Sequence, residues 1–321
     1  MSQRVGLDLA NGFIKVALEN GTNLVYENRL TQLTGLEFDA LDVNNETVYE
    51  VNGERYILSK TGISSGGRSS DRYFSPQYLI ECLIALSQVV TEQDVVLCVG
   101  LPCRDYLIPG LRDRMRDMLI GSYEVKINGK PKTIHIEHVE VTCEPLGSLL
   151  NVIYDSECRP VGDRNDYSYL VIDIGFGTTD ILGTKDGIRP VKLDYADVGI
   201  MDALNHYLTL INQRMADDGN AGRFAADDVT LMLQTDVRKY GRSFDFSPEL
   251  VRAKQYAAKL IEAKINQSGV NLNDYDRVLF TGGGAVALRE HLTIPHNARI
   301  NPRAQIGNAQ GYVKFLQLKG V

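Results

Sequence analysis

Glycines, hydroxyls and carboxylates that could bind a phosphate lie close together in residues 169–183, YLVIDIGFGTTDILG. An apolar run ends at Asp173, and the turn that follows contains Gly175 and Gly177. The hydroxyl of Thr178 comes next, ahead of another carboxylate and a second apolar run. Glycine allows the backbone to approach a bulky anion, and successive N–H groups there can form an anion-binding nest. The stretch predicts two strands joined by a phosphate-binding turn; an ordinary tight hairpin is the alternative.

The carboxylate at the entry to this turn indicates a cation. Asp173 would repel a bare phosphate, so its position suits the proposed chemistry only if a positive ion lies between them. Mg²⁺ prefers carboxylate and water oxygens and bridges to phosphate groups. We therefore expect a magnesium ion beside Asp173.

The same order of residue types occurs near the start of the chain. An apolar strand contains Asp8, the pair Asn11 and Gly12 is a strong hairpin signal, and an alternating strand with Lys15 follows. A repeat of strand, aspartate, small-residue turn and strand predicts two similar α/β domains that face each other across a cleft.

Two other strand ends carry residues of interest. A predicted strand ends at Cys143, and Glu144 with Pro145 begins a helix, so the Glu144 carboxylate projects from a helix N-terminus. Its alternative role is to interact only with the helix dipole. A second buried strand ends in Gly282, Gly283 and Gly284, which permit close approach of a flat ligand or a phosphate, although a structural turn would need them equally.

The remaining pattern supplies the elements that must position these residues. Residues 61–72 are interpreted as a polar surface loop and residues 155–167 as a linker between the halves. Gly307 and Gly311 lie four residues apart in a predicted helix, which indicates close packing against another helix. Hairpins are predicted at 48–58 and 122–141, and helices at 76–90, 109–119, 200–215, 224–234, 248–268 and 304–318.

Composition narrows the functional classes. The chain has 321 residues, of which 44% are hydrophobic and 23% charged, with a net charge of −7 and a pI near 5.4. This acidity argues against direct binding to nucleic-acid phosphates, which requires clustered Lys and Arg. The five cysteines include no CxxC pair, so we expect buried thiols in a reducing compartment and no zinc site. A signal peptide or a membrane span is not predicted, which favours a soluble cytoplasmic protein.

Five separated motifs occur in a fixed order that resembles the actin, Hsp70 and sugar-kinase superfamily of ATPases. They are the two phosphate motifs, the two connecting motifs and the adenosine motif, at 8–15, 144–145, 173–180, 282–285 and 308–311. Within this superfamily the chain is most similar to plasmid-segregating bacterial actins of the ParM/StbA type. Gly100-Leu101-Pro102, the Ile14-Lys15 pair and the sequence DIGFGTTD carry that similarity.

The resemblance implies an α/β fold in which two ribonuclease-H-like domains flank a nucleotide cleft. Domain I would comprise residues 1–163, completed by a C-terminal helix at 303–321, and domain II would comprise 164–302. Asp8 and Asp173 would hold Mg²⁺ largely through water, and Glu144 would orient or deprotonate the attacking water.

Other positions would contact the nucleotide itself. The family pattern places phosphate contacts at Asn11, Gly12 and Lys15 in the first domain and at Gly175, Gly177 and Thr178 in the second, a base and ribose pocket at Gly282, Gly283 and Gly284, and the interdomain connection at Asn308. Lys15 could equally be a surface lysine at a strand end. Ala10 stands where the family commonly has glycine, so we expect Asn11 and Gly12 to supply the positive φ angles of a slightly shifted turn.

The implied function is an ATPase, or a GTPase, that assembles head to tail into filaments. Such a filament would segregate plasmid or similar DNA through a DNA-binding adaptor protein, without direct DNA or membrane contact. A sugar-type kinase of the same fold is the alternative, together with a chaperone-like or membrane-tethered cytoskeletal ATPase. A non-catalytic binding module fits least, because the acids required for Mg²⁺ and water are present.

Overall fold

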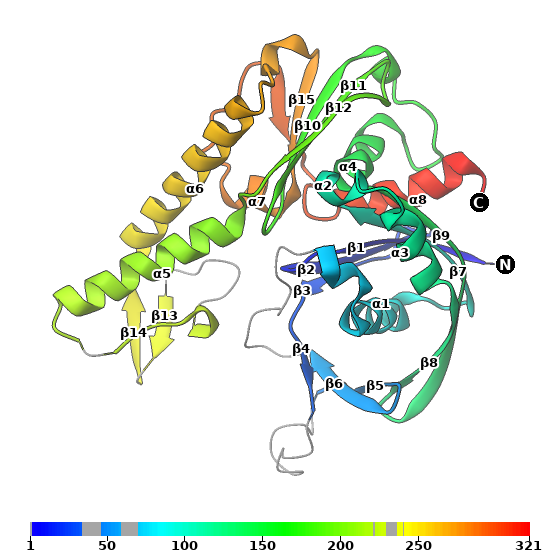
Figure 1. Ribbon diagram of the computed structural model, residues 1–321, viewed down its shortest axis with the longest axis horizontal. Coiled ribbons are helices and arrows are strands. Elements are labelled where there is room, and N and C mark those ends of the chain that lie inside the picture. The colour runs from blue at the N-terminus through cyan, green and yellow to red at the C-terminus, as the bar shows by residue number, and fades with distance from the viewer. Residues whose placement is uncertain (1, 34–45, 59–69, 221, 229–235, 240) are drawn as a thin grey trace. The chain divides into compact units, whose positions relative to one another are not determined.

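The computed structural model describes residues 2–33, 46–58, 70–220, 222–228, 236–239 and 241–321, and the chain forms two compact units (Figure 1). Unit 1 contains the described residues up to Arg159 and the segment Asn308–Val321. Unit 2 contains the described residues from Pro160 to Gly307. The loop predicted at 61–72 lies outside the described residues as far as residue 69.

The described residues of unit 1 form a nine-stranded sheet in the order β3-β2-β1-β7-β9-β8-β5-β6-β4. The strand β1 pairs antiparallel with β2 and parallel with β7, and β7 pairs parallel with β9. The strands are β1 Gln3–Leu9, β2 Phe13–Leu18, β3 Asn23–Glu27, β4 Leu30–Gln32, β5 Tyr49–Val51, β6 Glu54–Leu58, β7 Asp94–Leu101, β8 Gly121–Ile127 and β9 Lys130–Cys143.

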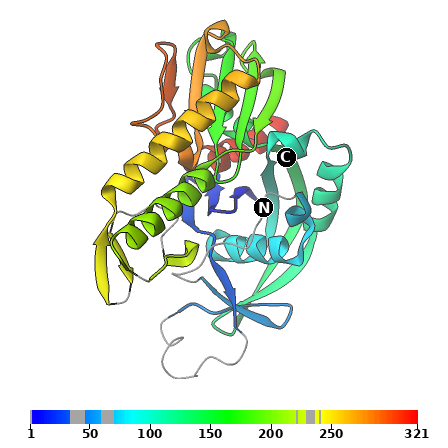
Figure 2. The ribbon, with the colours of Figure 1, turned by 60° about the vertical axis from the view of Figure 1, so that its left-hand side comes forward.

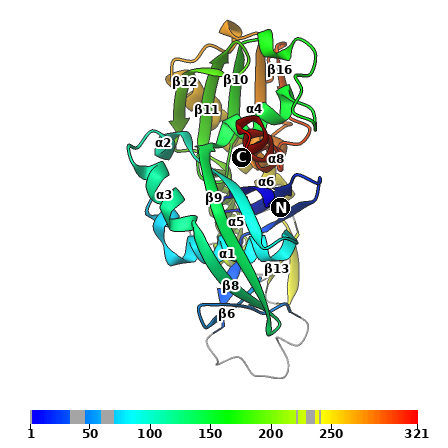
Figure 3. The ribbon, with the colours of Figure 1, turned by 90° about the vertical axis from the view of Figure 1, so that its right-hand side faces the viewer.

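Helices cover both faces of this sheet because its interior strand β7 is apolar on both sides. Val95, Leu97 and Val99 of β7 join the core that packs with helix α1 (Pro76–Val89). The alternate residues Val96 and Cys98 pack with helix α8 (Gly307–Lys319). The short helices α2 (Cys103–Tyr106) and α3 (Leu111–Leu119) and the helix α4 (Glu144–Ile153) complete the unit (Figure 3).

Unit 2 has a five-stranded sheet among its described residues, in the order β12-β11-β10-β15-β16. A separate hairpin, β13 and β14, lies near one end of the long helices α5 and α6 (Figure 2). The elements are β10 Tyr169–Ile174, β11 Thr179–Lys185, β12 Arg189–Ala196, α5 Ile200–Asp217, β13 Asp236–Lys239, β14 Arg242–Asp245, α6 Ser247–Gln267, β15 Arg277–Thr281, α7 Gly282–Ala287 and β16 Ala298–Ile300.

The two sheets share one five-strand topology. In unit 1 the order β3-β2-β1-β7-β9 has two antiparallel pairs followed by two parallel pairs. In unit 2 the order β12-β11-β10-β15-β16 has the same sequence of pairings. The structure therefore confirms the predicted pair of similar α/β domains, which the sequence indicated only through two turns.

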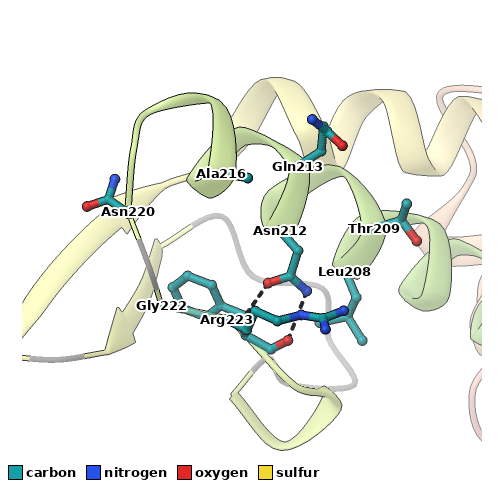
Figure 4. Close-up of a pocket in the computed structure, with 9 residues that line it drawn as sticks. Leu208, Thr209, Asn212, Gln213, Ala216, Asn220, Gly222 and Arg223 are labelled. Carbon is teal, nitrogen blue, oxygen red and sulfur yellow. Dashed lines mark hydrogen bonds between the residues drawn. The ribbon is translucent and has the colours of Figure 1, made fainter.

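Most predicted helices and hairpins are confirmed, but the helix predicted at 224–234 is wrong over its described part. Residues 226–228 form a 3₁₀ turn, and residues 229–235 lie outside the described residues. The backbone of Phe224 instead bonds the side chain of Asn212, which accepts from its N–H at 2.7 Å and donates to its carbonyl at 2.9 Å (Figure 4). Phe224 also packs edge-on against Phe244 and Phe246, so tertiary contacts override the local helical pattern.

The helices α4 and α8 cross at two glycines, Gly147 and Gly311. The spacing of Gly307 and Gly311 predicted close packing of α8 against another helix but did not identify that helix. A Cβ atom added to Gly311 would lie 1.7 Å from the carbonyl oxygen of Gly147. A Cβ atom added to Gly147 would lie 2.6 Å from the carbonyl oxygen of Asn308. The two backbones approach this closely only without side chains at the crossing.

Replacing Gly311 by alanine should lower the free energy of unfolding by about 2 kcal/mol, because the added methyl group overlaps backbone atoms that cannot move independently. Chemical denaturation monitored by circular dichroism measures this change. Gly283→Ala is the control, since a Cβ atom at Gly283 meets nothing within 4 Å. Equal stability of the Gly311→Ala variant and the unaltered protein would contradict the close helix crossing.

Candidate functional site

The first predicted turn joins β1 to β2 and contains a buried ion pair. Asp8 and Lys15 lie directly opposite each other in the antiparallel ladder. The Lys15 ammonium donates to Asp8 Oδ2 at 2.9 Å, and the two side chains are only 12% and 5% exposed. Lys15 is therefore a partly buried partner of Asp8. A contact of Lys15 with phosphate stays a prediction.

This turn does not use the backbone conformation that the sequence suggested. Neither Asn11 nor Gly12 has a positive φ angle, so that expectation is wrong. The turn is closed by a hydrogen bond from the Ala10 N–H to the Phe13 carbonyl at 3.2 Å. Because no residue at this turn has to adopt the left-handed region, alanine at position 10 fits without strain.

Neighbouring residues bind the carbonyl oxygens of the first turn. Arg72 donates to the Leu9 carbonyl at 2.9 Å, and the Asn28 side chain donates to the Ala10 carbonyl at 3.1 Å. The backbone N–H of Asn28 donates to the Gly12 carbonyl at 3.0 Å. The oxygens are thus satisfied within the protein and face Arg72 and Asn28.

Glu144 lies at the same edge of the unit 1 sheet as the first turn. The strands β1, β7 and β9 are parallel, so their carboxyl ends meet at one edge, and Glu144 begins α4 directly after β9. A Cβ atom on Gly100, at the end of β7, would lie 3.0 Å from Glu144 Cγ and 1.9 Å from the Tyr312 hydroxyl. Glycine at position 100 therefore leaves the space that the Glu144 side chain occupies.

A tyrosine close to Glu144 remains protonated. Burial, with a smaller contribution from the Glu144 carboxylate, raises the pKa of Tyr73 well above its usual value. At physiological pH its hydroxyl is neutral and able to donate a hydrogen bond.

The second predicted turn joins β10 to β11 and places two acids in one cross-strand pair. Asp173 and Asp180 are directly opposite each other, 4% and 1% exposed. Like charges at such positions repel, so a nearby cation would stabilise the pair. Thr178 donates to Asp180 Oδ2 at 3.1 Å. Asp180 occupies the register position that Lys15 occupies in the first hairpin.

The carbonyl oxygens of the second turn accept from a helix N-terminus. Ile200 N–H donates to the Gly175 carbonyl at 3.2 Å, and Met201 N–H donates to the Phe176 carbonyl at 2.8 Å. A Cβ atom on Gly199 would lie within 2.6 Å of the Phe176 carbonyl, so only glycine lets α5 approach this closely. The N-terminus of α5 therefore donates hydrogen bonds to the carbonyl oxygens of this turn, as Arg72 and Asn28 do at the first turn.

The three consecutive glycines after β15 have different structural roles. Gly282 has a φ of +84°, and a Cβ atom there would lie 2.3 Å from Asp173 Oδ1. A Cβ atom on Gly284 would lie 2.3 Å from Ile174 Cγ2. Gly283 alone borders open space. Gly282 and Gly284 thus allow α7 to pack on the second turn. A nucleotide contact at the three glycines stays a prediction.

Asn308 has a packing contact that the sequence did not indicate. It is buried, and its Oδ1 accepts from the Ser148 hydroxyl at 2.6 Å and from the Ser148 N–H at 3.1 Å. These bonds hold α8 on α4 at the helix crossing. A contact of Asn308 with nucleotide stays a prediction.

The donors fit a magnesium ion that keeps much of its hydration shell. In the described residues no group of three or more His, Cys, Asp or Glu side chains could form a complete protein cage for a metal. Asp8 and Asp173 offer hard carboxylate oxygens, and Mg²⁺ commonly binds through one or two carboxylates, water and substrate phosphates. Asp8 in unit 1 and Asp173 in unit 2 are each suited to be one such carboxylate.

Sequence reasoning missed the residues that support the turns from behind. Arg72, Asn28 and Gly199 belong to no chemical motif. The one feature of the sequence that could have indicated such support is Glu81, the single charged residue in the apolar run at 78–90.

The described surface has a hollow that contains none of the predicted site residues. It has a volume of about 640 Å³ and lies beside α5 (Figure 4). Its lining includes Asn212, Gln213, Asn220 and Arg223. Among the helices of the described residues, none has the length and apolar character required to cross a membrane.

Solved structures with the same fold include three that carry nucleotide or filament information. A crystal structure of the archaeal actin homologue Ta0583 in complex with ADP is 18% identical and has a TM-score of 0.76, with 99% of this chain and 100% of that chain covered. A 15-stranded ParM filament from Clostridium botulinum is 15% identical, with a TM-score of 0.73 and 99% of each chain covered. Bacillus thuringiensis ParM with ATP is also 15% identical, with a TM-score of 0.69 and 99% of each chain covered.

Family models match both halves of the sequence. No curated protein matches it. Residues 6–147 match the N-terminal domain of actin-like proteins, and residues 171–294 match the C-terminal domain of the MreB-like archaeal actin homologues. The first match contains Asp8 and Glu144, and the second contains Asp173 and the three glycines. The chain therefore belongs to the actin-like proteins, with the mixed α/β actin-like fold of two domains.

Proposed function

We propose that this protein is an actin-like ATPase that binds ATP with Mg²⁺, hydrolyses it, and assembles into filaments that segregate DNA. The observation that carries this proposal is the pair of equivalent hairpins, each with a buried aspartate beside a turn whose carbonyl oxygens are already bonded. Two such turns supply the N–H groups and the carboxylates that a nucleotide triphosphate with its metal requires.

Each of the predicted site residues has a distinct role in the proposed hydrolysis. Asp8 and Asp173 would hold a magnesium ion, which when bound would neutralise charge on the phosphate oxygens. Lys15 is placed beside Asp8 to neutralise phosphate charge from the first turn, and Asn11, Gly12, Gly175, Gly177 and Thr178 position the phosphates. Glu144, at the edge where β9 ends, orients the attacking water or accepts its proton.

The names of structural neighbours support assembly and nucleotide use. One is a ParM filament, one is an archaeal actin homologue with ADP, and one is a ParM with ATP. Successive copies of this chain would join head to tail, which gives an open filament when the contact does not close on itself.

The surface charge favours an indirect link to DNA. A net charge of −7 disfavours contact with DNA phosphates, so a basic adaptor protein would connect the filament to its cargo. All five cysteines are described and are free thiols, which suits the reducing cytoplasm.

Replacing Asp173 by asparagine should weaken ATP binding in the presence of Mg²⁺ by about tenfold or more, a loss of at least about 1.4 kcal/mol. Isothermal titration calorimetry with and without EDTA measures this effect. Asp194→Asn on β12 of the same sheet is the control, because Asp194 pairs with Lys192 away from the turn. An equal loss of affinity in EDTA would argue against a metal-binding role.

Replacing Glu144 by glutamine should lower the rate of ATP hydrolysis by roughly 10²-fold or more and leave ATP affinity unchanged, because the amide cannot accept the proton of water. Phosphate release and nucleotide titration separate the two effects. Glu137→Gln, an exposed position on β9, should change neither. Loss of ATP binding in the Glu144 variant would show that its role is misassigned.

Filament assembly should require ATP and Mg²⁺. We expect light scattering to rise and electron microscopy to show filaments when ATP and Mg²⁺ are added to the protein at tens of micromolar. The Asp173→Asn variant should assemble only at higher ATP concentration. Lack of assembly, or assembly that is indifferent to nucleotide, would refute the filament proposal.

A further inference from the structure

A buried glutamate lies behind the first turn and accepts hydrogen bonds from two of the groups that hold it. Glu81 of α1 is only 4% exposed. Its Oε2 accepts from the Asn28 amide at 3.0 Å and from Arg72 Nη2 at 2.9 Å. Gln77 donates to the other oxygen, Oε1, at 3.3 Å. We call Asn28, Arg72 and Glu81 the Glu81 cluster.

Each donor in the Glu81 cluster also binds the turn. Arg72 uses Nη2 for Glu81 and Nη1 for the Leu9 carbonyl. Asn28 uses one amide nitrogen, with its two hydrogens, for Glu81 and for the Ala10 carbonyl. One carboxylate therefore orients two side chains, and these bind two consecutive carbonyl oxygens of the turn.

The orientation of these carbonyls determines where the turn directs its N–H groups. In a planar trans peptide the C=O and the following N–H point in opposite directions. The Ala10 carbonyl points at Asn28, so the N–H of Asn11 points away from the Glu81 cluster. Asn11 N–H is thereby presented on the side of the turn opposite the cluster.

We propose that the Glu81 cluster is a positioning device that preorganises the first turn to bind a nucleotide phosphate; this inference rests on the proposed ATPase function. None of the three side chains needs to touch the nucleotide. Their effect is to hold the Asn11 N–H in its binding orientation before the ligand arrives, so that binding does not have to order the turn.

The second turn supports this assignment because its carbonyl oxygens are also bonded within the protein, although by different groups. There, the N–H groups of Ile200 and Met201 at the start of α5 bind the carbonyls of Gly175 and Phe176. The two turns lie at equivalent positions of sheets with the same topology. Both turns thus have bonded carbonyls, although one uses a helix N-terminus and the other uses side chains.

The ionic character of the Glu81 cluster explains why removing one member should loosen the orientation of the turn. Buried charges require partners with good geometry, and charge-assisted hydrogen bonds are the stronger ones. Arg72 also lies over the ring of Tyr78, 5.2 Å from its centroid, which limits the positions that its guanidinium can adopt. Without the Glu81 charge, the hydrogen bonds from Arg72 and Asn28 lose their charge assistance, so both donors are held less firmly.

The test compares Glu81→Gln with Glu249→Gln. Glu249 is an equally buried glutamate in unit 2 that accepts from Arg214 at 3.0 Å and from Arg252 at 3.1 Å. Both variants should have a lower melting temperature. Only Glu81→Gln should raise the dissociation constant for ATP with Mg²⁺, by about tenfold. A purely structural role would reduce the folded fraction of both variants without changing the dissociation constant of the folded protein.

A second readout does not depend on nucleotide binding. Hydrogen–deuterium exchange of a peptide covering residues 9–13, measured without nucleotide, should be faster in Glu81→Gln and unchanged in Glu249→Gln. If the unaltered protein fails to bind ATP, the proposed function is wrong, while this exchange experiment still decides whether the cluster orders the turn. Exchange equal to that of the unaltered protein would overturn the inference.

Arg72→Lys gives an independent test if Glu81→Gln does not fold. Lysine keeps the charge that pairs with Glu81, but one ammonium group cannot reproduce the planar fork that reaches both Glu81 and the Leu9 carbonyl. We expect weaker ATP binding and faster exchange at the turn. An affinity equal to that of the unaltered protein would show that this bridge has no positioning role.

Discussion

A backbone turn offers its N–H groups to a phosphate more readily when its carbonyl oxygens are held away from the anion, since oxygens facing the anion would repel it. In both hairpin turns of this protein, two consecutive carbonyl oxygens have partners within the protein. At the second turn the partners are N–H groups at the start of α5, and at the first they are Arg72 and Asn28. Much of the surrounding packing can be understood as the means of bringing these donors to the two turns.

Close backbone approach is the second requirement, and glycine provides it where helices and strands pack around the turns. Gly199 lets α5 reach the second turn, and Gly282 lets the chain pass beside Asp173. In unit 1, Gly100 leaves room for Glu144, and the pair Gly147 and Gly311 brings α8 onto α4. Several glycines of this chain are thus explained by close packing, whereas Gly283, in the run of three after β15, borders open space.

The two hairpins differ at one register position, and this difference changes the net charge of the cross-strand pair. Asp8 faces Lys15, whereas Asp173 faces Asp180. A lysine offsets the charge of the first aspartate, whereas the pair at the second turn consists of two carboxylates of like charge. The two hairpins therefore differ in charge although the sheets that contain them are equivalent in topology.

The sequence by itself determined the two hairpins, the aspartates at their ends, the helix that begins at Glu144 and the close packing around Gly311, because each depends on residues near in the chain and on hydrophobic periodicity. Only the tertiary structure revealed that Lys15 is buried against Asp8, that Asn11 and Gly12 avoid positive φ, and that residues 224–228 are held by Asn212 and two phenylalanine rings instead of forming a helix. It alone joined Glu81, Arg72 and Asn28 behind the first turn. These contacts connect residues as far as 53 positions apart, and their geometry comes from packing that no local pattern encodes.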